Sequence, residues 1–377
     1  MDNKVRLVQV IGGGEFGGAE RYVLNLACGL DKDIFEPIVA CGYEGRLSRT
    51  LREEGVPVHV LPSGTGGLSA LSGLLRTVRP QIVHTHGVRG NLFGRLAARR
   101  TGVPALVTTV HSDMALDYPA LLKRTAYMLL DRLTDPMVTR YVVVSEAMKS
   151  VVVRRGIGTG RITVVPNGVD TTAFHPSPGA AAWLHDQVGV GPQVRLVGMA
   201  ARLHPVKGHD LFLRAAAELA ATSRTLDIRF LVVGSGPPEY REHLEAQTER
   251  LGLRGRVLFL GEREDVPAIL AGLDAAVVPS RFEAFSLSVI EAMASGAPLV
   301  ATRVGAIPEI VEDGVTGLLS HPGDALDLAA KILTVLVDRD LARRLTENGL
   351  QAADRYSIDK FIRRMGELYL ELLKGQA

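Results

Sequence analysis

The chain has 377 residues, which is too long for one ordinary hydrophobic core and fits two domains. An apolar fraction of 46% and a charged fraction of 22% are typical of a soluble globular protein, and an aromatic fraction of 5% argues against stacking platforms for nucleic acid. The net charge of +2 conceals a basic first half, because residues 1–170 carry 21 Lys and Arg against 15 Asp and Glu, a balance of +6.

Most of this basic excess lies between Gln81 and Arg161. It has two interpretations, a solvated basic face or a surface for an anionic lipid or an anionic acceptor. The chain enters a strand-like run at Val5 without the basic head and apolar stretch of a signal peptide, and no run approaches the ~18 apolar residues of a membrane span. The chain has only two cysteines, which is too few for a framework of disulfide bonds. We therefore expect a cytoplasmic protein, with any membrane contact peripheral and on the inner face of the plasma membrane.

Short runs that are apolar on both faces alternate with helical patterns, as expected for buried parallel strands with helical crossovers. In the first half these runs are Val5–Ile11, Pro37–Cys41, Val56–Leu61, Gln81–His86, Ala105–His111, Tyr141–Ser145 and Ile162–Pro166. In the second half they are Arg195–Ala200, Ile228–Gly234, Val257–Gly261, Ala275–Pro279 and Pro298–Thr302. The pattern predicts an α/β protein with two doubly wound, Rossmann-like domains facing across a cleft.

A stretch rich in Pro and Gly interrupts the strand–helix rhythm between Asp170 and Gln193, and after Asp324 the pattern is wholly helical. We predict an N-terminal domain over 1–172, a C-terminal domain over 173–355, and a last helix over 356–377 that packs back on the N-terminal domain.

The first candidate site is the glycine-rich segment after the first strand, from Gly12 to Glu20. Gly12, Gly14 and Gly17 satisfy the G-x-G-x-x-G spacing, but the acid that a dinucleotide site needs after the second strand comes only at Glu44. Nicotinamide binding, a structural tight turn and contact with a phosphorylated ligand remain open, and the last is favoured because glycine lets backbone N–H groups approach phosphate.

The second candidate follows the first strand of the second domain, where Arg202 and Lys207 precede a helix. A planar guanidinium and a compact ammonium suit a diphosphate. The alternative is a pair of solvated side chains.

The third candidate runs from Ser280 to Glu291. Glu283 lies in the loop after a strand, Ser286 is a good N-cap, and Glu291 lies about a turn and a half into the helix. Backbone N–H groups over 284–287 would face an anion, and the two carboxylates could accept hydrogen bonds from sugar hydroxyls. A glycosidase carboxylate pair is the alternative, but the basic and amide groups fit a phosphorylated leaving group better.

The segment from Glu283 through Glu291 to Val300 resembles the E-x7-E motif of the retaining glycosyltransferases of family 4, which have the GT-B architecture. Further segments in the same order resemble other motifs of the family: Gly17-Gly18-Ala19-Glu20, Val165-Pro166-Asn167-Gly168-Val169-Asp170, Val233-Gly234-Ser235-Gly236-Pro237 and Pro308-Glu309-Ile310-Val311.

The resemblance implies a role for each matching residue. Arg202 and Lys207 would bind the donor diphosphate, Glu291 the ribose, and Glu283 the transferred sugar. The remaining implied site residues are Gly17, Gly18, Glu20, His111, Ala284, Phe285, Ser286 and Leu287, of which His111 would lie near the reaction centre and Glu20 would help to position the acceptor.

The resemblance also implies transfer of a hexose-type sugar from a UDP- or GDP-sugar to a hydroxyl acceptor with retention of configuration, in the biosynthesis of envelope polysaccharide, lipopolysaccharide or glycolipid. No metal and no cofactor are expected beyond the nucleotide sugar, and the acceptor would be a glycan, a glycolipid or a small hydroxyl compound. A nucleotide-binding oxidoreductase and a non-catalytic sugar-nucleotide-binding subunit are the alternatives.

The segment Pro119–Thr134 mixes leucines with Lys123, Arg124 and Arg132. It would either contact an anionic bilayer or a lipid-linked acceptor, or pack as an amphipathic helix on its own domain.

Overall fold

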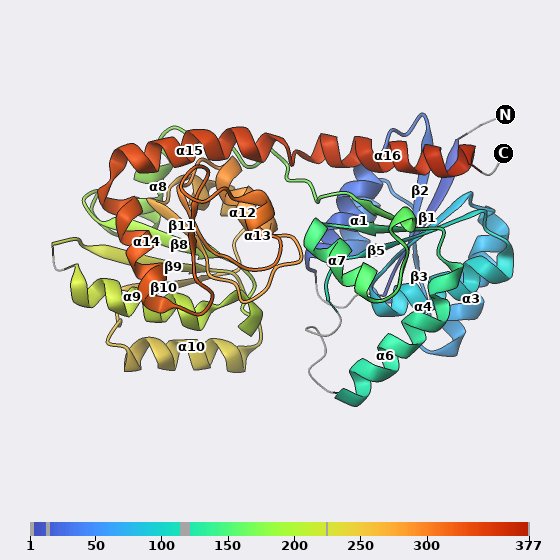
Figure 1. Cartoon of the computed structure of the whole chain (residues 1–377), viewed down its shortest axis with the longest axis horizontal. Coiled ribbons are helices and arrows are strands. Elements are labelled where there is room, and N and C mark those ends of the chain that lie inside the picture. Colours follow the sequence, from blue (N-terminus) through green and yellow to red (C-terminus); the bar gives the residue numbers. More distant parts are fainter. Residues whose placement is uncertain (1–3, 13–15, 114–120, 224, 376–377) are drawn as a thin grey trace. The chain divides into compact units, whose positions relative to one another are not determined.

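The computed structural model describes residues 4–12, 16–113, 121–223 and 225–375 (Figure 1). The chain divides into two compact units. The N-terminal unit comprises residues 1–168 and 358–377, and the C-terminal unit comprises residues 169–357. The predicted boundaries at 172/173 and 355/356 lie within four residues of these divisions.

A parallel sheet of seven strands forms the centre of the N-terminal unit, in the order β3-β2-β1-β4-β5-β6-β7. Its strands are β1 (Val5–Ile11), β2 (Phe35–Cys41), β3 (Val58–Val60), β4 (Ile82–His86), β5 (Ala105–Val110), β6 (Arg140–Val143) and β7 (Ile162–Val164). The chain reverses its direction of winding between β1 and β4, and ligands of open α/β sheets bind beside such a point.

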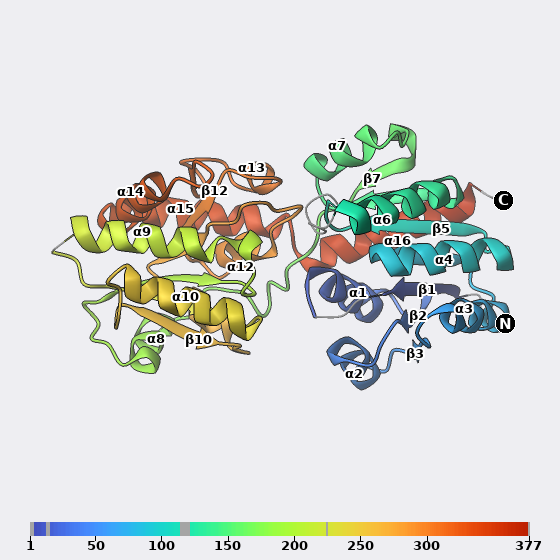
Figure 2. The ribbon, with the colours of Figure 1, turned by 90° about the horizontal axis from the view of Figure 1, so that it is seen from below.

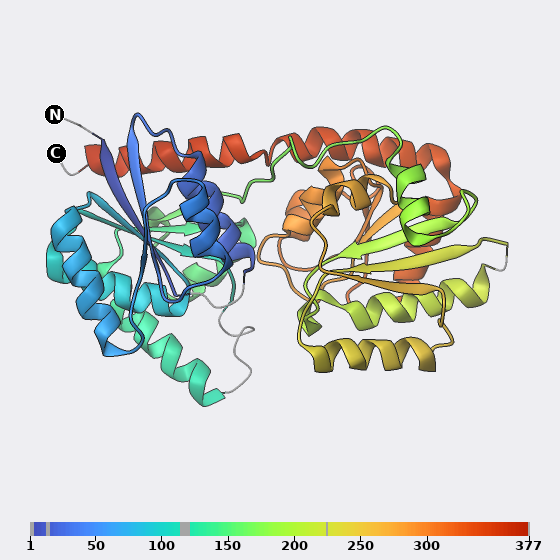
Figure 3. The ribbon, with the colours of Figure 1, turned by 180° about the vertical axis from the view of Figure 1, so that it is seen from behind.

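Helices cover both faces of this sheet, as seen from two sides in Figures 2 and 3. They are α1 (Gly18–Gly29), α2 (Arg46–Glu53), α3 (Thr65–Val78), α4 (Gly87–Thr101), α6 (Leu121–Thr134), α7 (Glu146–Arg154) and α16 (Ile358–Lys374), with 3-10 turns η1 (Asp135–Met137) and η2 (Thr159–Arg161). Tyr22 of α1 and Tyr369 of α16 pack with Leu7 and Val107 on one face. The last helix of the chain therefore completes the core of the N-terminal unit.

The C-terminal unit has a parallel sheet of six strands in the order β10-β9-β8-β11-β12-β13. Its strands are β8 (Arg195–Ala200), β9 (Ile228–Val233), β10 (Val257–Gly261), β11 (Ala275–Val278), β12 (Leu299–Thr302) and β13 (Leu318–Ser320). The switch in winding direction lies between β8 and β11.

Helices α9 (His209–Thr222) and α14 (Ala325–Val337) bury apolar faces on one side of this sheet, with α10 (Pro238–Arg250) beside α9. The opposite side carries helices that contact one another: α8 (Ala180–Val188), α11 (Val266–Ala271), α12 (Leu287–Ala294) and α15 (Arg339–Asp354). A turn η3 (Pro205–Lys207) and a short helix α13 (Ile307–Ile310) complete the unit.

Each strand run expected from the sequence is a strand in the structure, with ends that differ by at most two residues. His111, predicted as the last residue of a strand, lies one residue beyond β5. The strand β13 was not predicted, because its sequence Leu318-Leu319-Ser320 offers only two apolar residues between Gly317 and His321.

Candidate functional site

The glycine-rich segment of the N-terminal unit leads from β1 into α1. Gly13 to Glu15 lie outside the described residues, so the middle glycine of the fingerprint, Gly14, has no structural account. A Cβ on Gly12 would lie 2.5 Å from Arg89 Cβ and 2.9 Å from Gly90 N. The close packing of α4 against this segment thus leaves no room for a side chain at the first glycine of the fingerprint.

Glu20 closes the first turn of α1. Its carboxylate accepts a hydrogen bond from Gly17 N at 3.0 Å, and its residue is only 7% exposed. This is half of a capping box, because glycine has no side chain to return the bond. Gly18 is exposed, and no atom would come within 4 Å of a Cβ placed on it, so one side of the first turn is open.

His111 lies at the carboxyl end of the sheet, directly after β5. Its Nε2 is 3.0 Å from Nδ1 of His86, and its ring packs against that of Tyr22 with centroids 4.9 Å apart. Burial lowers the pKa of His111 to about 3, so the ring is neutral near pH 7.

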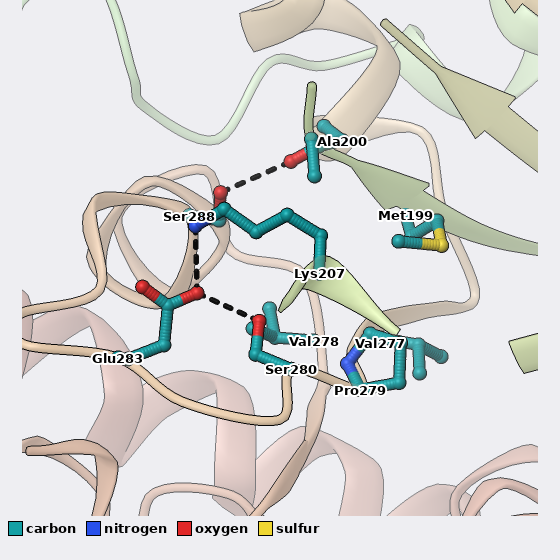
Figure 4. Close-up of a pocket in the computed structure, with 10 residues that line it drawn as sticks. Met199, Ala200, Lys207, Val277, Val278, Pro279, Ser280, Glu283 and Ser288 are labelled. Carbon is teal, nitrogen blue, oxygen red and sulfur yellow. Dashed lines mark hydrogen bonds and ion pairs between the residues drawn. The ribbon is translucent and has the colours of Figure 1, made fainter. Parts of the chain in front are cut away.

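In the C-terminal unit a small hollow, partly open to solvent, lies at the carboxyl ends of β8 and β11 (Figure 4). Residues from both strand ends, η3 and the start of α12 form its wall: Met199, Ala200, Ala201, Lys207, Val277, Val278, Pro279, Ser280, Glu283 and Ser288. This is the edge at which ligands of such sheets bind.

Lys207 and Glu283 meet in this hollow, as Figure 4 shows. Lys207 Nζ lies 2.8 Å from Glu283 Oε1, and Ser280 Oγ donates to the same oxygen at 2.7 Å. The Glu283 side chain is 6% exposed and that of Lys207 is 25% exposed. A carboxylate removed from water needs such partners, because an unpaired buried charge is costly. Lys207 is therefore part of a built site and not a solvated side chain.

The loop after β12 holds the backbone of Glu283. Ala306 N donates to Glu283 O at 2.9 Å, and a Cβ on Gly305 would lie 1.9 Å from the same oxygen. Gly305 also has a φ of +52°, which L side chains rarely adopt. A second close approach occurs at Gly208, where a Cβ would lie 1.9 Å from Pro279 O, and there φ is +73°.

The start of α12 is tied to the end of β8, because Ser288 Oγ donates to Ala200 O at 3.0 Å. Ser286 is the N-cap residue, as predicted, but its side chain makes no cap hydrogen bond. Its hydroxyl is buried without a partner among the described residues, so the expectation of a side-chain cap was wrong.

The other predicted residues of the C-terminal unit do not line the hollow. Arg202 is exposed, two residues beyond β8. Glu291 is in the middle of α12 and 6% exposed, so it is not an ordinary solvated helix acid. Ala284 and Phe285 are buried, and Leu287 is the first residue of α12.

Three residues in these arrangements were not predicted to have a role. Ser280 bonds Glu283, Ser288 bonds the end of β8, and His86 bonds His111. Ser280 and His86 stand at or just after strand ends, and this position is the signal that could have identified them.

Among residues 4–12, 16–113, 121–223 and 225–375, no group of three His, Cys, Asp or Glu side chains is arranged to hold a metal ion. In the same part of the chain, no helix has the length and the apolar character that crossing a membrane requires.

Two family descriptions match the sequence. Residues 16–173 match "Glycosyltransferase Family 4", and residues 194–338 match "Glycosyl transferases group 1". A D-inositol 3-phosphate glycosyltransferase of Nocardia farcinica is 32% identical over 90% of this chain and 81% of the relative. The UDP-Gal:alpha-D-GlcNAc-diphosphoundecaprenol alpha-1,3-galactosyltransferase of Escherichia coli is 27% identical over 94% of this chain and 90% of the relative.

Solved structures resemble the whole chain. HepE of Anabaena in complex with UDP-glucose has a TM-score of 0.87 and 25% identity, covering 97% of this chain and 99% of HepE. WaaG, a glycosyltransferase of lipopolysaccharide biosynthesis, has a TM-score of 0.76 and 18% identity, covering 97% and 99% of the two chains. Both have the GT-B fold, which confirms the predicted fold class.

Proposed function

Because the chain belongs to the glycosyltransferases of family 4, we propose that it moves a hexose-type sugar from a nucleoside diphosphate sugar to an acceptor hydroxyl, with retention of configuration. The observation that carries the proposal is the pairing of Lys207 with Glu283 in the hollow at the ends of β8 and β11. A partly exposed ammonium and a buried carboxylate at this edge offer one group for a phosphate and one for sugar hydroxyls.

In this proposal Lys207 and Arg202 bind the diphosphate and stabilise it as it leaves. Hydrogen bonds to a charged group contribute about 1.5–3 kcal/mol each. Glu283 accepts from hydroxyls of the transferred sugar and Glu291 from the ribose, with the backbone over 284–287 beside the donor. The leaving phosphate then helps to remove the acceptor proton on the same face of the sugar, and no metal or further cofactor is needed.

In the N-terminal unit, Gly17 and Gly18 would allow the backbone to approach the donor, because the first turn of α1 is open at Gly18. Glu20 fixes this turn through its bond to Gly17 N. His111 would lie near the reacting sugar as a neutral ring, since burial lowers its pKa to about 3.

We propose UDP as the first nucleotide to test and GDP as the second. The E. coli relative is named for a UDP-Gal donor, and HepE was solved with UDP-glucose. For the acceptor we propose a hydroxyl compound that carries phosphate, in cell-envelope biosynthesis. One relative is named for inositol 3-phosphate and another for a diphosphoundecaprenol acceptor, and the basic first half of this chain suits either.

A thermal-shift screen of nucleotides and nucleotide sugars tests the donor. A ligand that binds the folded state at one hundred times its Kd raises stability by about 2.7 kcal/mol. The nucleotide sugar that raises Tm most is then tested for hydrolysis and for transfer to phosphorylated acceptors, and proton NMR of the product shows whether the anomeric configuration is kept.

Lys207→Ala and Glu283→Gln should each abolish most donor hydrolysis, while Lys331→Ala, at a part-buried lysine of the same unit, should leave it unchanged. A non-catalytic subunit would bind nucleotide but show no hydrolysis or transfer in any variant. If no nucleotide raises Tm, the proposed donor chemistry is wrong.

We also propose that α6 contacts an anionic membrane. Leu129 is 57% exposed and Leu133 is 64% exposed on this helix, with Arg132 exposed beside them. Exposed leucines next to a basic side chain suit the interface of an anionic bilayer. Pro119 and Ala120 of the predicted segment lie outside the described residues.

Co-sedimentation of the full chain with phosphatidylglycerol vesicles tests this contact. Leu129→Ser with Leu133→Ser should release the protein from the vesicles. Leu326→Ser removes an apolar side chain of similar exposure, 65%, from the C-terminal unit and should change nothing. Equal sedimentation of the wild type, the double variant and Leu326→Ser would contradict the membrane contact.

A further inference from the structure

Three histidines lie together on one face of the N-terminal sheet. His84 and His86 alternate on β4, and His111 follows β5 on the same face. The rings of His84 and His86 have centroids 4.2 Å apart, and those of His86 and His111 are 5.3 Å apart. Tyr22 of α1 and Tyr369 of α16 cover them. We call these three side chains the histidine cluster.

The rings of the cluster are neutral. His84 and His86 are fully buried, and burial lowers the pKa of both well below the usual value. Tyr22 and Tyr369 are uncharged as well, because burial raises the pKa of both phenols. Each histidine therefore carries one ring proton, and its neighbours decide which nitrogen holds it.

The position of the proton on His84 follows from its partners. Thr109 donates its hydroxyl proton to Tyr22 Oη at 3.3 Å, and Tyr22 donates to Met365 Sδ at 3.3 Å. Thr109 Oγ1, 2.6 Å from His84 Nε2, must then accept from that nitrogen. His84 Nδ1 consequently accepts from Tyr369 Oη at 2.6 Å. His84 is the Nε2–H tautomer.

The bond between His86 and His111 fixes the other two rings. His86 Nδ1 and His111 Nε2 are 3.0 Å apart, so one of these nitrogens carries a proton and the other accepts it. His86 Nε2 is buried and has no partner among the described residues. If it held the proton, a buried N–H would lack an acceptor, and such orphaned donors are rarer in proteins than unpaired acceptors. The proton of His86 is therefore on Nδ1.

We propose that His86 is a positioning residue that donates to His111 Nε2 and so holds His111 in its Nδ1–H tautomer. In the described part of the chain no protein group hydrogen-bonds to His111 Nδ1, and the His111 side chain is partly exposed. His111 thus offers an N–H donor and no basic nitrogen. Under the proposed function, this N–H would bond an oxygen of the sugar or of the leaving group, and His111 would not act as the base that takes the acceptor proton.

The tautomers can be measured without any substrate. The full-length protein is labelled with 15N-histidine, and long-range 15N–1H correlation at pH 7.5 shows which ring nitrogen of each histidine is protonated. Single substitutions, including His111→Gln, assign the signals. We expect Nδ1–H for His86 and His111 and Nε2–H for His84. A wild-type spectrum with His111 as Nε2–H or as imidazolium overturns the inference.

Two substitutions test the positioning role. The amide nitrogen of His86→Asn can stand near the place of Nδ1, so His111 should remain Nδ1–H. The amide of His86→Gln reaches the place of Nε2 instead, so His111 should shift to a mixture of tautomers. Tyr369→Phe is the control, because it removes a bond to His84 and leaves the His86–His111 bond intact.

If His111 keeps the Nδ1–H form in His86→Gln, His86 does not set its tautomer and the positioning role is wrong. Circular dichroism of each variant shows that the fold is kept, and the wild-type spectrum alone decides the tautomer if a variant does not fold. The spectrum depends on no donor or acceptor, so its outcome is separate from that of the proposed function.

Discussion

At the scale of single residues, Glu283 depends on partners from three parts of the C-terminal unit. Ser280 and Lys207 share its Oε1, and the loop after β12 holds its backbone through Ala306 N. Before a donor binds, Lys207 and Glu283 neutralise each other in a site with little access to water. In the proposed function, the donor phosphate replaces Glu283 as the charged partner of Lys207, while sugar hydroxyls and Ser280 hydrogen-bond the Glu283 carboxylate, which is less costly than leaving either charge unpaired.

Ser280→Ala should weaken the reaction without unfolding the protein. The variant removes one hydrogen bond to a carboxylate, which contributes about 1.5–3 kcal/mol, and we expect kcat/KM for transfer to fall about ten- to a hundredfold. Ser295→Ala is the matched control, because its hydroxyl is buried in the same unit and has no partner among the described residues. Equal kcat/KM in the two variants would show that Ser280 does not orient Glu283.

Gly305→Ala should displace Glu283. The added Cβ would lie 1.9 Å from Glu283 O, so the loop must move, and a shift of about 1 Å at a reacting group can lower the rate about a hundredfold. Gly323→Ala is the control, since its φ of +77° carries a similar conformational cost while no atom lies within 4 Å of its Cβ. Steady-state kinetics and thermal unfolding of both variants separate the effect of moving Glu283 from the conformational cost that both variants share. Unchanged kinetics in Gly305→Ala would show that the loop does not hold Glu283 in place.

At the scale of elements, α6 is anchored to α4 and η1 by a buried ionic network. Arg95 is fully buried, and its Nη1 lies 2.9 Å from Asp131 Oδ1 and 3.3 Å from Asp135 Oδ1. Arg155 pairs with both aspartates, and Tyr141 donates to Asp135. The charges of two arginines and two aspartates thus neutralise one another where α4, α6 and η1 meet.

Asp131→Asn should destabilise the N-terminal unit by about 3–5 kcal/mol, because it leaves two largely buried guanidinium charges to share the single carboxylate of Asp135. Urea unfolding followed by circular dichroism measures the loss. The only tryptophan, Trp183, lies in α8 of the C-terminal unit, so the transition seen in its fluorescence should not move. Glu44→Gln breaks an exposed pair with Arg52 and should have little effect. A similar small effect of Asp131→Asn would show that the network adds no stability.

The elements were largely predictable and their side-chain partners were not. Strands such as β1 and β8 are apolar on both faces, and this local pattern identifies them in the sequence. The Lys207–Glu283 pair joins residues 76 positions apart, and the His84–Tyr369 bond joins residues 285 positions apart. Such contacts depend on how the helices pack on the sheet, and a local pattern in one sequence does not show this packing. The E-x7-E motif gave Glu283, but it marks neither Ser280, which bonds Glu283 from three positions earlier, nor His86, which bonds His111 from a neighbouring strand.

At the scale of the whole molecule, the two units should differ in their response to acid. The N-terminal unit buries His84 and His86, whose pKa values are lowered well below the usual value, and the pKa of His111 falls to about 3. The C-terminal unit buries His209, whose pKa is lowered to about 4, again chiefly by burial. Below about pH 6.5 the unfolded chain binds protons at these histidines and the folded chain does not, so stability falls as pH falls.

Between pH 7.0 and 5.5, each fully buried histidine should lower the free energy of unfolding by about 1.3 kcal/mol. His84 and His86 together would cost the N-terminal unit about 2.5 kcal/mol, with more from His111, and His209 would cost the C-terminal unit about half of that. Urea unfolding at the two pH values measures both, since Trp183 fluorescence follows the C-terminal unit and the remaining circular dichroism transition follows the N-terminal unit.

His84→Gln should reduce the pH dependence of the N-terminal unit by about 1.3 kcal/mol, whereas His59→Gln, at an exposed histidine of β3, should not change it. The same loss of unfolding free energy in both units would contradict this prediction, and so would the same pH dependence in His84→Gln and His59→Gln. Either result would mean that the histidine cluster is protonated in the folded protein, in conflict with the neutral rings that its hydrogen bonds require.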